Sequence, residues 1–111
     1  MADQTIILRR TRDKLGSRFL GATLTSDGTV TIRGQDLGRG VAEVFGAGNT
    51  EYEWVWTIPP DSVTALCKSL DCGDDVLAGL QSNFSGDDAA KLKSYLDESG
   101  IQYKASSRLG D

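Results

Sequence analysis

The chain has 111 residues and a formal net charge of −4, and its 39% hydrophobic residues are enough for one folded domain spanning residues 1–111. It contains no histidine, so histidine-based acid–base catalysis and histidine-containing zinc sites are excluded. Its two cysteines are too few for a four-thiolate zinc site or an iron–sulfur cluster within one chain. We therefore expect no metal and no cofactor.

The N-terminal third predicts a strand followed by a hairpin. Residues 5–9 are β-branched and apolar, which indicates a strand, and residues 11–16 have the composition of a loop. An Asp-Gly pair then separates two segments of alternating apolar residues, 19–25 and 29–33. Because Asp and Gly tolerate positive φ at both turn positions, this pair predicts a tight β-hairpin.

The middle of the chain predicts a connection and then the clearest strand. Residues 34–50 are rich in glycine, which is typical of irregular backbone. Residues 51–58 alternate cleanly, and one face of the predicted strand holds an aromatic row, Tyr52, Trp54 and Trp56. We interpret the aromatic row as part of a core beneath helices, with a stacking or partner-binding platform as the alternative.

The second half of the chain predicts helices. After Pro59-Pro60 the apolar period changes from about 2 to about 3.6, which predicts helices at 61–71, 74–84 and 86–99. Asp74 is the expected N-cap of the second helix. Ser85 and Asp88 have capping-box spacing at the start of the third helix.

The end of the chain completes the predicted fold. Gly100 is a typical residue to end the third helix, and residues 101–105 alternate again as a last strand. The order of strands, then helices, then one strand indicates an α+β fold. We expect an antiparallel sheet of four to five strands with about three helices packed on one face, because the early connections are too short for helical crossovers.

Charge is unevenly divided along the chain. Residues 1–39 hold seven basic and four acidic side chains, whereas residues 40–111 hold five basic and twelve acidic ones. The acidic excess argues against a nucleic-acid partner, because neutralising phosphates requires surplus Lys and Arg. The basic cluster from Arg9 to Arg18 is interpreted as a solvated strand end and loop, with a patch for an anionic ligand or partner as the alternative. The longest apolar run is short, so we expect a cytoplasmic protein without a membrane partner.

Motifs of known chemistry are incomplete in this sequence. Gly38-Arg39-Gly40 begins like a dinucleotide fingerprint, but Glu43 occupies the position of its third glycine. Cys67 lies on the apolar stripe of its helix and is interpreted as a small buried thiol. Acidic neighbours disfavour the thiolate of Cys72, so neither cysteine is expected to be a nucleophile.

Two functions of different classes remain. The first is a non-enzymatic protein-binding domain, of the immunity or antitoxin kind, that neutralises a basic partner through charge complementarity. Its expected contact residues lie in the glycine-rich connection and on the exposed face of the next strand: Asp36, Arg39, Glu43, Glu51 and Glu53. The second is a small-molecule binder or an enzyme with carboxylate chemistry in the 34–50 connection, in which Asp36 or Glu51 would act with Arg33 or Arg39.

Part of the sequence has a recognisable resemblance. The segments Gly34-Gln35-Asp36-Leu37-Gly38 and Glu51-Tyr52-Glu53-Trp54, a helix pair, and the terminal Ser107-Arg108-Leu109-Gly110-Asp111 resemble a group of small uncharacterised proteins from actinomycete bacteria. The resemblance covers most of residues 28–111. It implies a bacterial cytoplasmic protein, and it carries no activity and no functional residue to this chain.

Overall fold

The structure is a computed structural model, and it describes residues 3–13, 16–38 and 51–110. Within these ranges the strands are β1 (Gln4–Asp13), β2 (Gly16–Leu24), β3 (Val30–Leu37), β4 (Glu51–Ile58) and β5 (Lys104–Gly110). The helices are α2 (Pro60–Leu70), α3 (Val76–Asn83), the 3-10 helix η1 (Gly86–Lys91) and α4 (Leu92–Glu98). The strands form one antiparallel sheet in the order β1-β2-β3-β4-β5. This confirms the predicted α+β fold.

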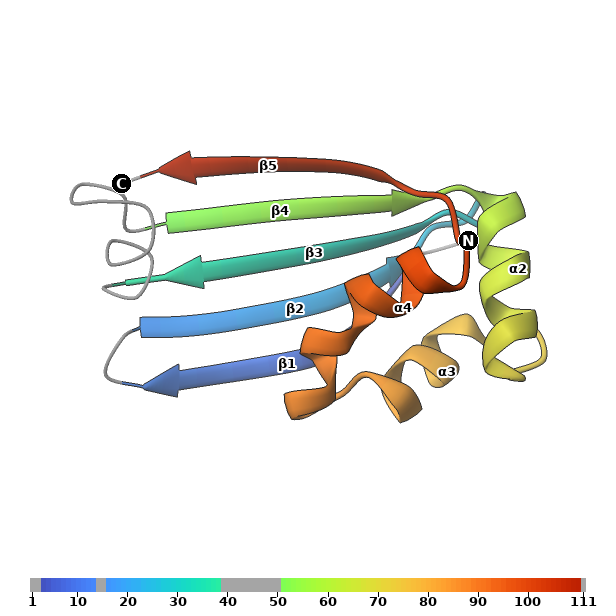
Figure 1. The fold of residues 1–111 in the computed structure, drawn as a ribbon, viewed down its shortest axis with the longest axis horizontal. Coiled ribbons are helices and arrows are strands. Elements are labelled where there is room, and N and C mark those ends of the chain that lie inside the picture. The colour runs from blue at the N-terminus through green and yellow to red at the C-terminus, as the bar shows by residue number, and fades with distance from the viewer. Residues whose placement is uncertain (1–2, 14–15, 39–50, 111) are drawn as a thin grey trace.

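The helices lie at one end of the sheet, and the strands extend beyond them toward the other end (Figure 1). α3 contacts β1 and β2, η1 contacts β1, and α2 contacts α3. We call the face that carries the buried strand residues Ala22, Ile32 and Ile58 the helix-side face. These side chains and those of the helices, including Leu66 and Leu96, form the hydrophobic core. None of the helices in the described ranges is long and apolar enough to cross a membrane.

The strand register sorts the helix-side face into rows that run across the sheet. The apolar row near the helices contains Ile6, Ala22, Ile32, Trp56 and Ala105. The next row is mixed and contains Arg9, Leu20, Gly34, Trp54 and Ser107. The following row is mostly polar and contains Thr11, Arg18, Asp36 and Tyr52. The chemistry of one face therefore changes from apolar to polar along the strands.

A β-bulge in β1 produces part of this change. The register shifts between Ile7 and Arg9, and the additional residue, Leu8, is only 2% exposed. One inserted residue reverses the alternation that follows it, because successive strand side chains point to opposite faces. Leu8 therefore joins the core, and Arg9 lies opposite Leu20 on the helix-side face.

Three strand ends differ from the prediction. β1 continues to Asp13 through most of the predicted loop, since β2 starts at Gly16 and pairs with this whole length. β3 continues to Leu37, into the segment predicted as irregular, because β4 pairs with it throughout. β5 starts at Lys104 and not at the predicted Ile101, which is buried in the core. Cross-strand partners set these lengths, and the local sequence does not show them.

The predicted hairpin between β2 and β3 is confirmed, but its turn differs from the expected one. The backbone N–H of Thr25 donates to the carbonyl of Thr29 at 2.9 Å, which leaves three residues in the loop. Only Gly28 has a positive φ, of 91°, within this turn. A three-residue loop needs one left-handed residue, whereas the expected two-residue turn needs two.

Helix capping also differs from the prediction. Asp75, and not Asp74, caps α3, and its Oδ1 accepts from the Ala78 N–H at 3.1 Å. Ser85 does not cap the next helix, since its hydroxyl donates to the carbonyl of Gln81. The third predicted helix is divided into η1 and α4. α4 ends as predicted, because Gly100 follows it with a φ of 70°.

Candidate functional site

The aromatic row of β4 lies where the helical layer stops. Tyr52, Trp54 and Trp56 share the helix-side face with Ile58, which is fully buried. Trp54 and Trp56 pack against the core on one side and remain half-buried. The ring centroids of Tyr52 and Trp54 are 5.3 Å apart, and those of Trp54 and Trp56 are 6.4 Å apart. The interpretation of the row as core is therefore right only in part, because one side of each tryptophan is exposed.

Trp54 lies directly over Gly34 of β3. A Cβ atom at position 34 would come within 2.0 Å of the Cε2 and Cζ2 atoms of the indole. Gly34 therefore belongs to a strand and makes room for a ring, whereas the sequence suggested an irregular connection. The Nε1 atom of Trp54 is buried in this position and has no hydrogen-bond partner.

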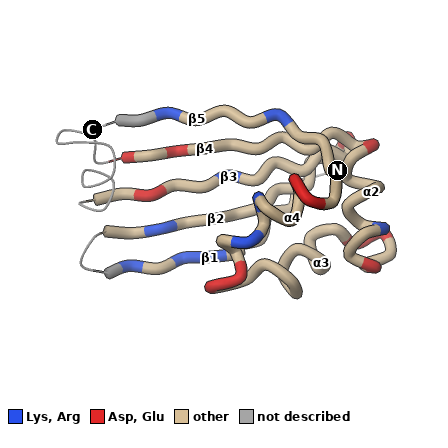
Figure 2. The backbone as a smooth tube through the Cα atoms, in the orientation of Figure 1, with Lys and Arg blue, Asp and Glu red and all other residues tan. Residues whose placement is uncertain are grey.

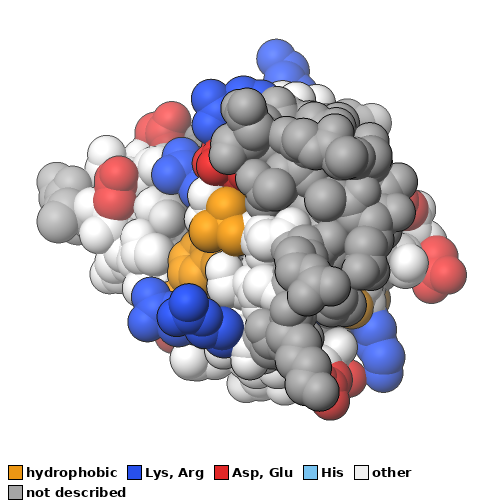
Figure 3. Space-filling model, turned by 90° about the vertical axis from the view of Figure 1, so that its left-hand side faces the viewer, with side chains coloured by type: hydrophobic (Ala, Val, Ile, Leu, Met, Phe, Trp, Pro, Cys, Tyr) orange, Lys and Arg blue, Asp and Glu red, His pale blue; other side chains and the backbone are white. Residues whose placement is uncertain are grey.

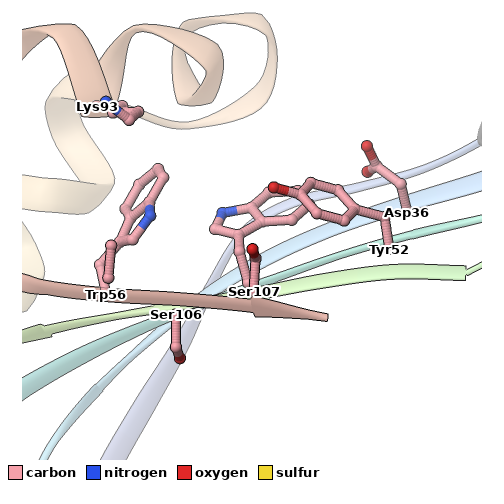
Figure 4. Close-up of a pocket in the computed structure, with 8 residues that line it drawn as sticks. Asp36, Tyr52, Trp56, Lys93, Ser106 and Ser107 are labelled. Atoms are coloured by element: carbon pink, nitrogen blue, oxygen red, sulfur yellow. The ribbon is translucent and has the colours of Figure 1, made fainter. Parts of the chain in front are cut away.

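A groove of about 450 Å³ opens beside the aromatic row, and we call it the aromatic groove. It is lined by the aromatic row, by Asp36 and Lys93, and by residues 105–107 of β5. In Figure 4, Tyr52, Trp56 and Ser107 rise from the same side of the sheet. Lys93 lies on the helix beyond Trp56, and Asp36 lies at the opposite end. The side chain of Ser106 points to the other side of β5.

The Lys93 end of the aromatic groove is fixed by Asp97. The carboxylate of Asp97 accepts from the Lys93 ammonium at 2.9 Å and from the Tyr103 hydroxyl at 2.7 Å. These hydrogen bonds lower the pKa of Asp97, and the bond to Asp97 raises the pKa of Lys93. Tyr103 in turn contacts Trp56, with ring centroids 6.0 Å apart. The ammonium is therefore held in its charged form beside the aromatic row.

At the other end of the aromatic groove, the negative charge of the Asp36 carboxylate is less well compensated. Asp36 lies opposite Arg18 on β2 and Tyr52 on β4. Its Oδ1 atom is buried without a hydrogen bond, and no ion pair links its carboxylate to a described arginine. Burial raises the pKa of Asp36, while the charges of Arg18 and Arg9 offset part of this effect. A desolvated carboxyl group in a cleft is a feature of functional sites.

The remaining predicted contact residues do not join Asp36. Glu51 and Glu53 lie on the opposite face of the sheet, as strand alternation requires. Arg108 donates to Glu51 at 3.4 Å and to Glu53 at 3.0 Å, and Gln35 donates to Glu53 at 3.0 Å. The two glutamates therefore belong to a cross-strand polar network. Two further predicted contact residues, Arg39 and Glu43, lie outside the described residues.

The contact between the two glutamates shifts their pKa values in opposite directions. A hydrogen bond between the carboxyl groups raises the pKa of Glu51 and lowers that of Glu53. Such a pair shares one proton more readily than two isolated carboxylates do. This pair lies on an exposed strand face, and Arg108 already binds both members.

The alternative pairing of Asp36 with Arg33 is not formed. Arg33 lies opposite Gly21 and Val55, which places its side chain on the face away from Asp36. Glu51 shares a face with Arg33, but the carboxylate of Glu51 is bound by Arg108. Within the described residues, the carboxylate chemistry expected from the sequence is thus reduced to Asp36 in the aromatic groove.

The cysteines form no reactive centre. Cys67 is buried in α2, as predicted, and burial raises the pKa of its thiol to about 12. Cys72 contacts it, with its Sγ 3.6 Å from the carbonyl oxygen of Cys67. In the part of the chain that the structure describes, no group of three Cys, Asp or Glu side chains is placed to hold a metal ion.

Some residues of the aromatic groove were missed in the sequence. The alternation along β3 was a usable signal, because Asp36 lies an even number of residues from the buried Val30 and Ile32 and therefore shares their face of the strand. Lys93 and Ser107 carried no comparable signal, because only the packing of α4 and the length of β5 bring them to the groove.

We compared the chain with family models, with curated proteins and with solved structures. No family model matches the chain, and no curated protein and no solved structure matches it. The functional argument therefore rests on the described residues themselves.

Proposed function

We propose that this protein is a non-enzymatic protein-binding domain that holds its partner in the aromatic groove. The observation that carries the proposal is that both tryptophans of the chain are half-buried in one groove beyond the helical layer. Tyr, Trp and Arg are the residue types that contribute most at the centres of protein interfaces. Tyr52 continues the aromatic row, and Arg9 lies in the same row of this face as Trp54.

The charge of the chain supports a basic partner. The net charge is −4, and residues 60–98, which contain the helices, hold eight acidic side chains against three lysines. Figure 2 shows acidic residues along this helical part of the chain. Next to the aromatic groove, η1 and α4 hold two lysines, Lys91 and Lys93, against four acidic residues, Asp87, Asp88, Asp97 and Glu98. Opposite potentials steer association and suppress wrong partners. Neutralisation of a basic toxin, as by an immunity or antitoxin protein, is the biological role that we propose for this interaction.

Adjacent residues of β5 provide a matched test of the surface. Ser107 lines the aromatic groove, whereas the side chain of Ser106 points to the other side of the strand (Figure 4). A photo-crosslinking amino acid is placed at either position in the full chain and irradiated in cells of the source organism. We expect a protein crosslink from position 107 that position 106 does not give. Equal crosslinking from both positions, or none from position 107, would overturn the proposal.

The identity of the crosslinked protein tests whether the partner is basic. We expect a basic protein, and we expect Trp54→Ala to weaken its binding more than tenfold, since interface tryptophans often contribute about 2 kcal/mol or more. If the partner is a toxin, co-expression of this chain restores growth and the Trp54→Ala variant does not. An acidic partner would contradict the charge argument and leave the groove as the binding surface.

A second candidate is a small-molecule binder or an enzyme that uses Asp36. The specific support is the raised pKa of Asp36 together with its buried, unbonded Oδ1 atom in the aromatic groove. Because both tryptophans line this groove, their fluorescence reports any ligand there. Saturable quenching by a metabolite, lost in Asp36→Asn and accompanied by no protein crosslink at position 107, would favour this candidate over the first.

A further inference from the structure

A second pocket lies on the face opposite the aromatic groove, near the end of β1 and β2. In the register of these strands, Arg10 lies opposite Phe19 and Arg12 lies opposite Ser17. These four residues share a pocket of about 430 Å³ with Thr11, Arg18 and Gln35. We call it the arginine pocket. It stands independently of the proposed function, because it uses none of the residues that line the aromatic groove.

Arg10 and Arg12 of the arginine pocket have no ion-pair partner among the described side chains. The third arginine of the pocket, Arg18, lies near the carboxylate of Asp36. Elsewhere on the protein, Arg108, Lys91 and Lys93 form ion pairs with carboxylates. Neither Arg10 nor Arg12 forms an ion pair with a side chain that the structure describes, and both are exposed.

The guanidinium of Arg10 lies over the Phe19 ring, 6.0 Å from its centroid. This contact orients Arg10 without neutralising it. The arginine pocket is therefore a cationic recess on a protein that is acidic overall.

The figures show the same separation of charge. Lys and Arg mark β1 and β2, whereas β3 and β4 carry Asp and Glu toward the same end of the sheet (Figure 2). Seen from this end, Lys and Arg side chains lie beside exposed hydrophobic side chains (Figure 3). A cationic and a hydrophobic surface thus adjoin each other.

We propose that the arginine pocket binds the phosphate group of a small phosphomonoester. The planar guanidinium of an arginine donates two parallel hydrogen bonds to an oxyanion, and Arg10 and Arg12 project from the same face of β1 two residues apart. Ser17, opposite Arg12, adds a hydroxyl donor. The Phe19 ring provides an apolar surface for the organic part of the ligand.

The surroundings of the arginine pocket favour a compact anion over a long polyanion. In the row that contains Arg10, the strand after Phe19 contributes Gln35, and the next strand contributes Glu53. A nucleic-acid strand or an anionic membrane would extend past Gln35 and meet the carboxylates of Glu51 and Glu53. A single phosphate group on β1 and β2 avoids this repulsion.

The test uses phenyl phosphate as the probe and the full chain as the protein. Binding is followed by the chemical shifts of backbone amides in β1 and β2, and we expect a saturable change centred on residues 10–12 and 17–19. Arg12→Gln should weaken binding about tenfold or more, because it removes charge-assisted hydrogen bonds to the phosphate group.

Arg33→Gln is the matched control, since Arg33 is exposed on the same face, loses the same charge and lies outside the pocket. We expect it to change the affinity less than twofold. Equal weakening by Arg12→Gln and Arg33→Gln would show that only the overall charge matters and would overturn the site.

Three further ligands test separately the need for a phosphate group, the contribution of the organic group and the preference for a small anion. Phenol should not bind, inorganic phosphate should bind more weakly than phenyl phosphate, and a single-stranded oligonucleotide should bind no more tightly than phenyl phosphate. Tighter binding of the oligonucleotide, with a steep salt dependence, would replace the proposal with a polyanion site.

The pH dependence gives a separate check, because the second phosphate pKa is about 6 and the chain has no histidine to titrate in this range. Affinity should rise between about pH 5 and about pH 7 as the ligand becomes a dianion. Flat binding across this range would contradict recognition of the dianion.

Discussion

The two halves of the helix-side face come from the same strands and the same alternation, yet they differ in chemistry. Beneath the helices, Ala22, Ile32 and Ile58 are 0% exposed. A few residues further along, β2 and β3 present Arg18 and Asp36 on this face. Alternation decides which side chains share a face, and the helical layer decides which part of that face becomes core.

This difference separates stability from binding. In the covered half, each side chain contacts others that exclude water, so its contribution is to the free energy of unfolding. In the uncovered half, the aromatic row is covered on one side only, and Asp36 is desolvated without a hydrogen-bond partner for its Oδ1 atom. Such an arrangement costs stability unless a partner completes it.

The largest effect should come from the covered half. Leu96→Ala in α4 removes a side chain that is 0% exposed and should lower the free energy of unfolding by about 2–5 kcal/mol. Leu37→Ala removes the same atoms from a residue that is 36% exposed, on the face of the sheet that no described helix covers, and should cost less than about 1 kcal/mol. Urea unfolding of both variants measures this contrast. Similar losses would show that the helices do not define the core.

The boundary between the halves should give an intermediate effect. Gly34→Ala places a Cβ atom 2.0 Å from the Trp54 ring and should destabilise the fold by about 1–3 kcal/mol, with the tryptophan emission shifted to the red. Trp54→Ala removes the clash, so the double variant should be more stable than the sum of the two single effects predicts. Additive effects would mean that Trp54 does not lie over position 34.

The smallest effect should be a pH dependence of opposite sign at two aspartates. The pKa of Asp36 is raised by burial, so its ionisation weakens the folded state as pH rises through its unfolded and folded values. The pKa of Asp97 is lowered by Lys93 and Tyr103, so its ionised form stabilises the folded state above its unfolded value and loses this effect in acid.

Asp36→Asn should therefore raise the free energy of unfolding at about pH 7, and Asp97→Asn should lower it, while both differences shrink toward about pH 3. Denaturant titrations at several pH values measure the two signs. A destabilised Asp36→Asn at neutral pH would mean that the carboxylate is paired in the folded protein.

Much of the fold could be predicted because its signals are local. Asp-Gly between alternating segments indicated the hairpin, and the change of period after Pro59-Pro60 indicated the helices. Gly100 indicated the end of α4. The predicted strand ends were wrong where pairing with a neighbouring strand determines the length. Asp13 and Leu37 are such ends, because each pairs with residues of neighbouring strands.

The candidate site could be predicted only in part. Asp36 was selected from the sequence, and it lies in the aromatic groove. Glu51 and Glu53 were selected with it, but they lie on the other face, because strand alternation within β4 separates them from Tyr52 and Trp54. The tryptophans were assigned to the core, since an apolar strand face does not reveal how far a helical layer extends over it.

By itself, the sequence determined the α+β class, the hairpin, the helices and the face on which each β4 side chain lies, because residue spacing and turn residues act over a few positions. Only the tertiary structure decided that Trp54 lies over Gly34, that Asp36 is desolvated in a groove, and that Arg10 and Arg12 lie opposite Phe19 and Ser17. These facts depend on strand register, on the bulge at Leu8 and on where the helices stop. Each results from packing between segments that are far apart in the chain, and local residue patterns do not show which distant segments come into contact.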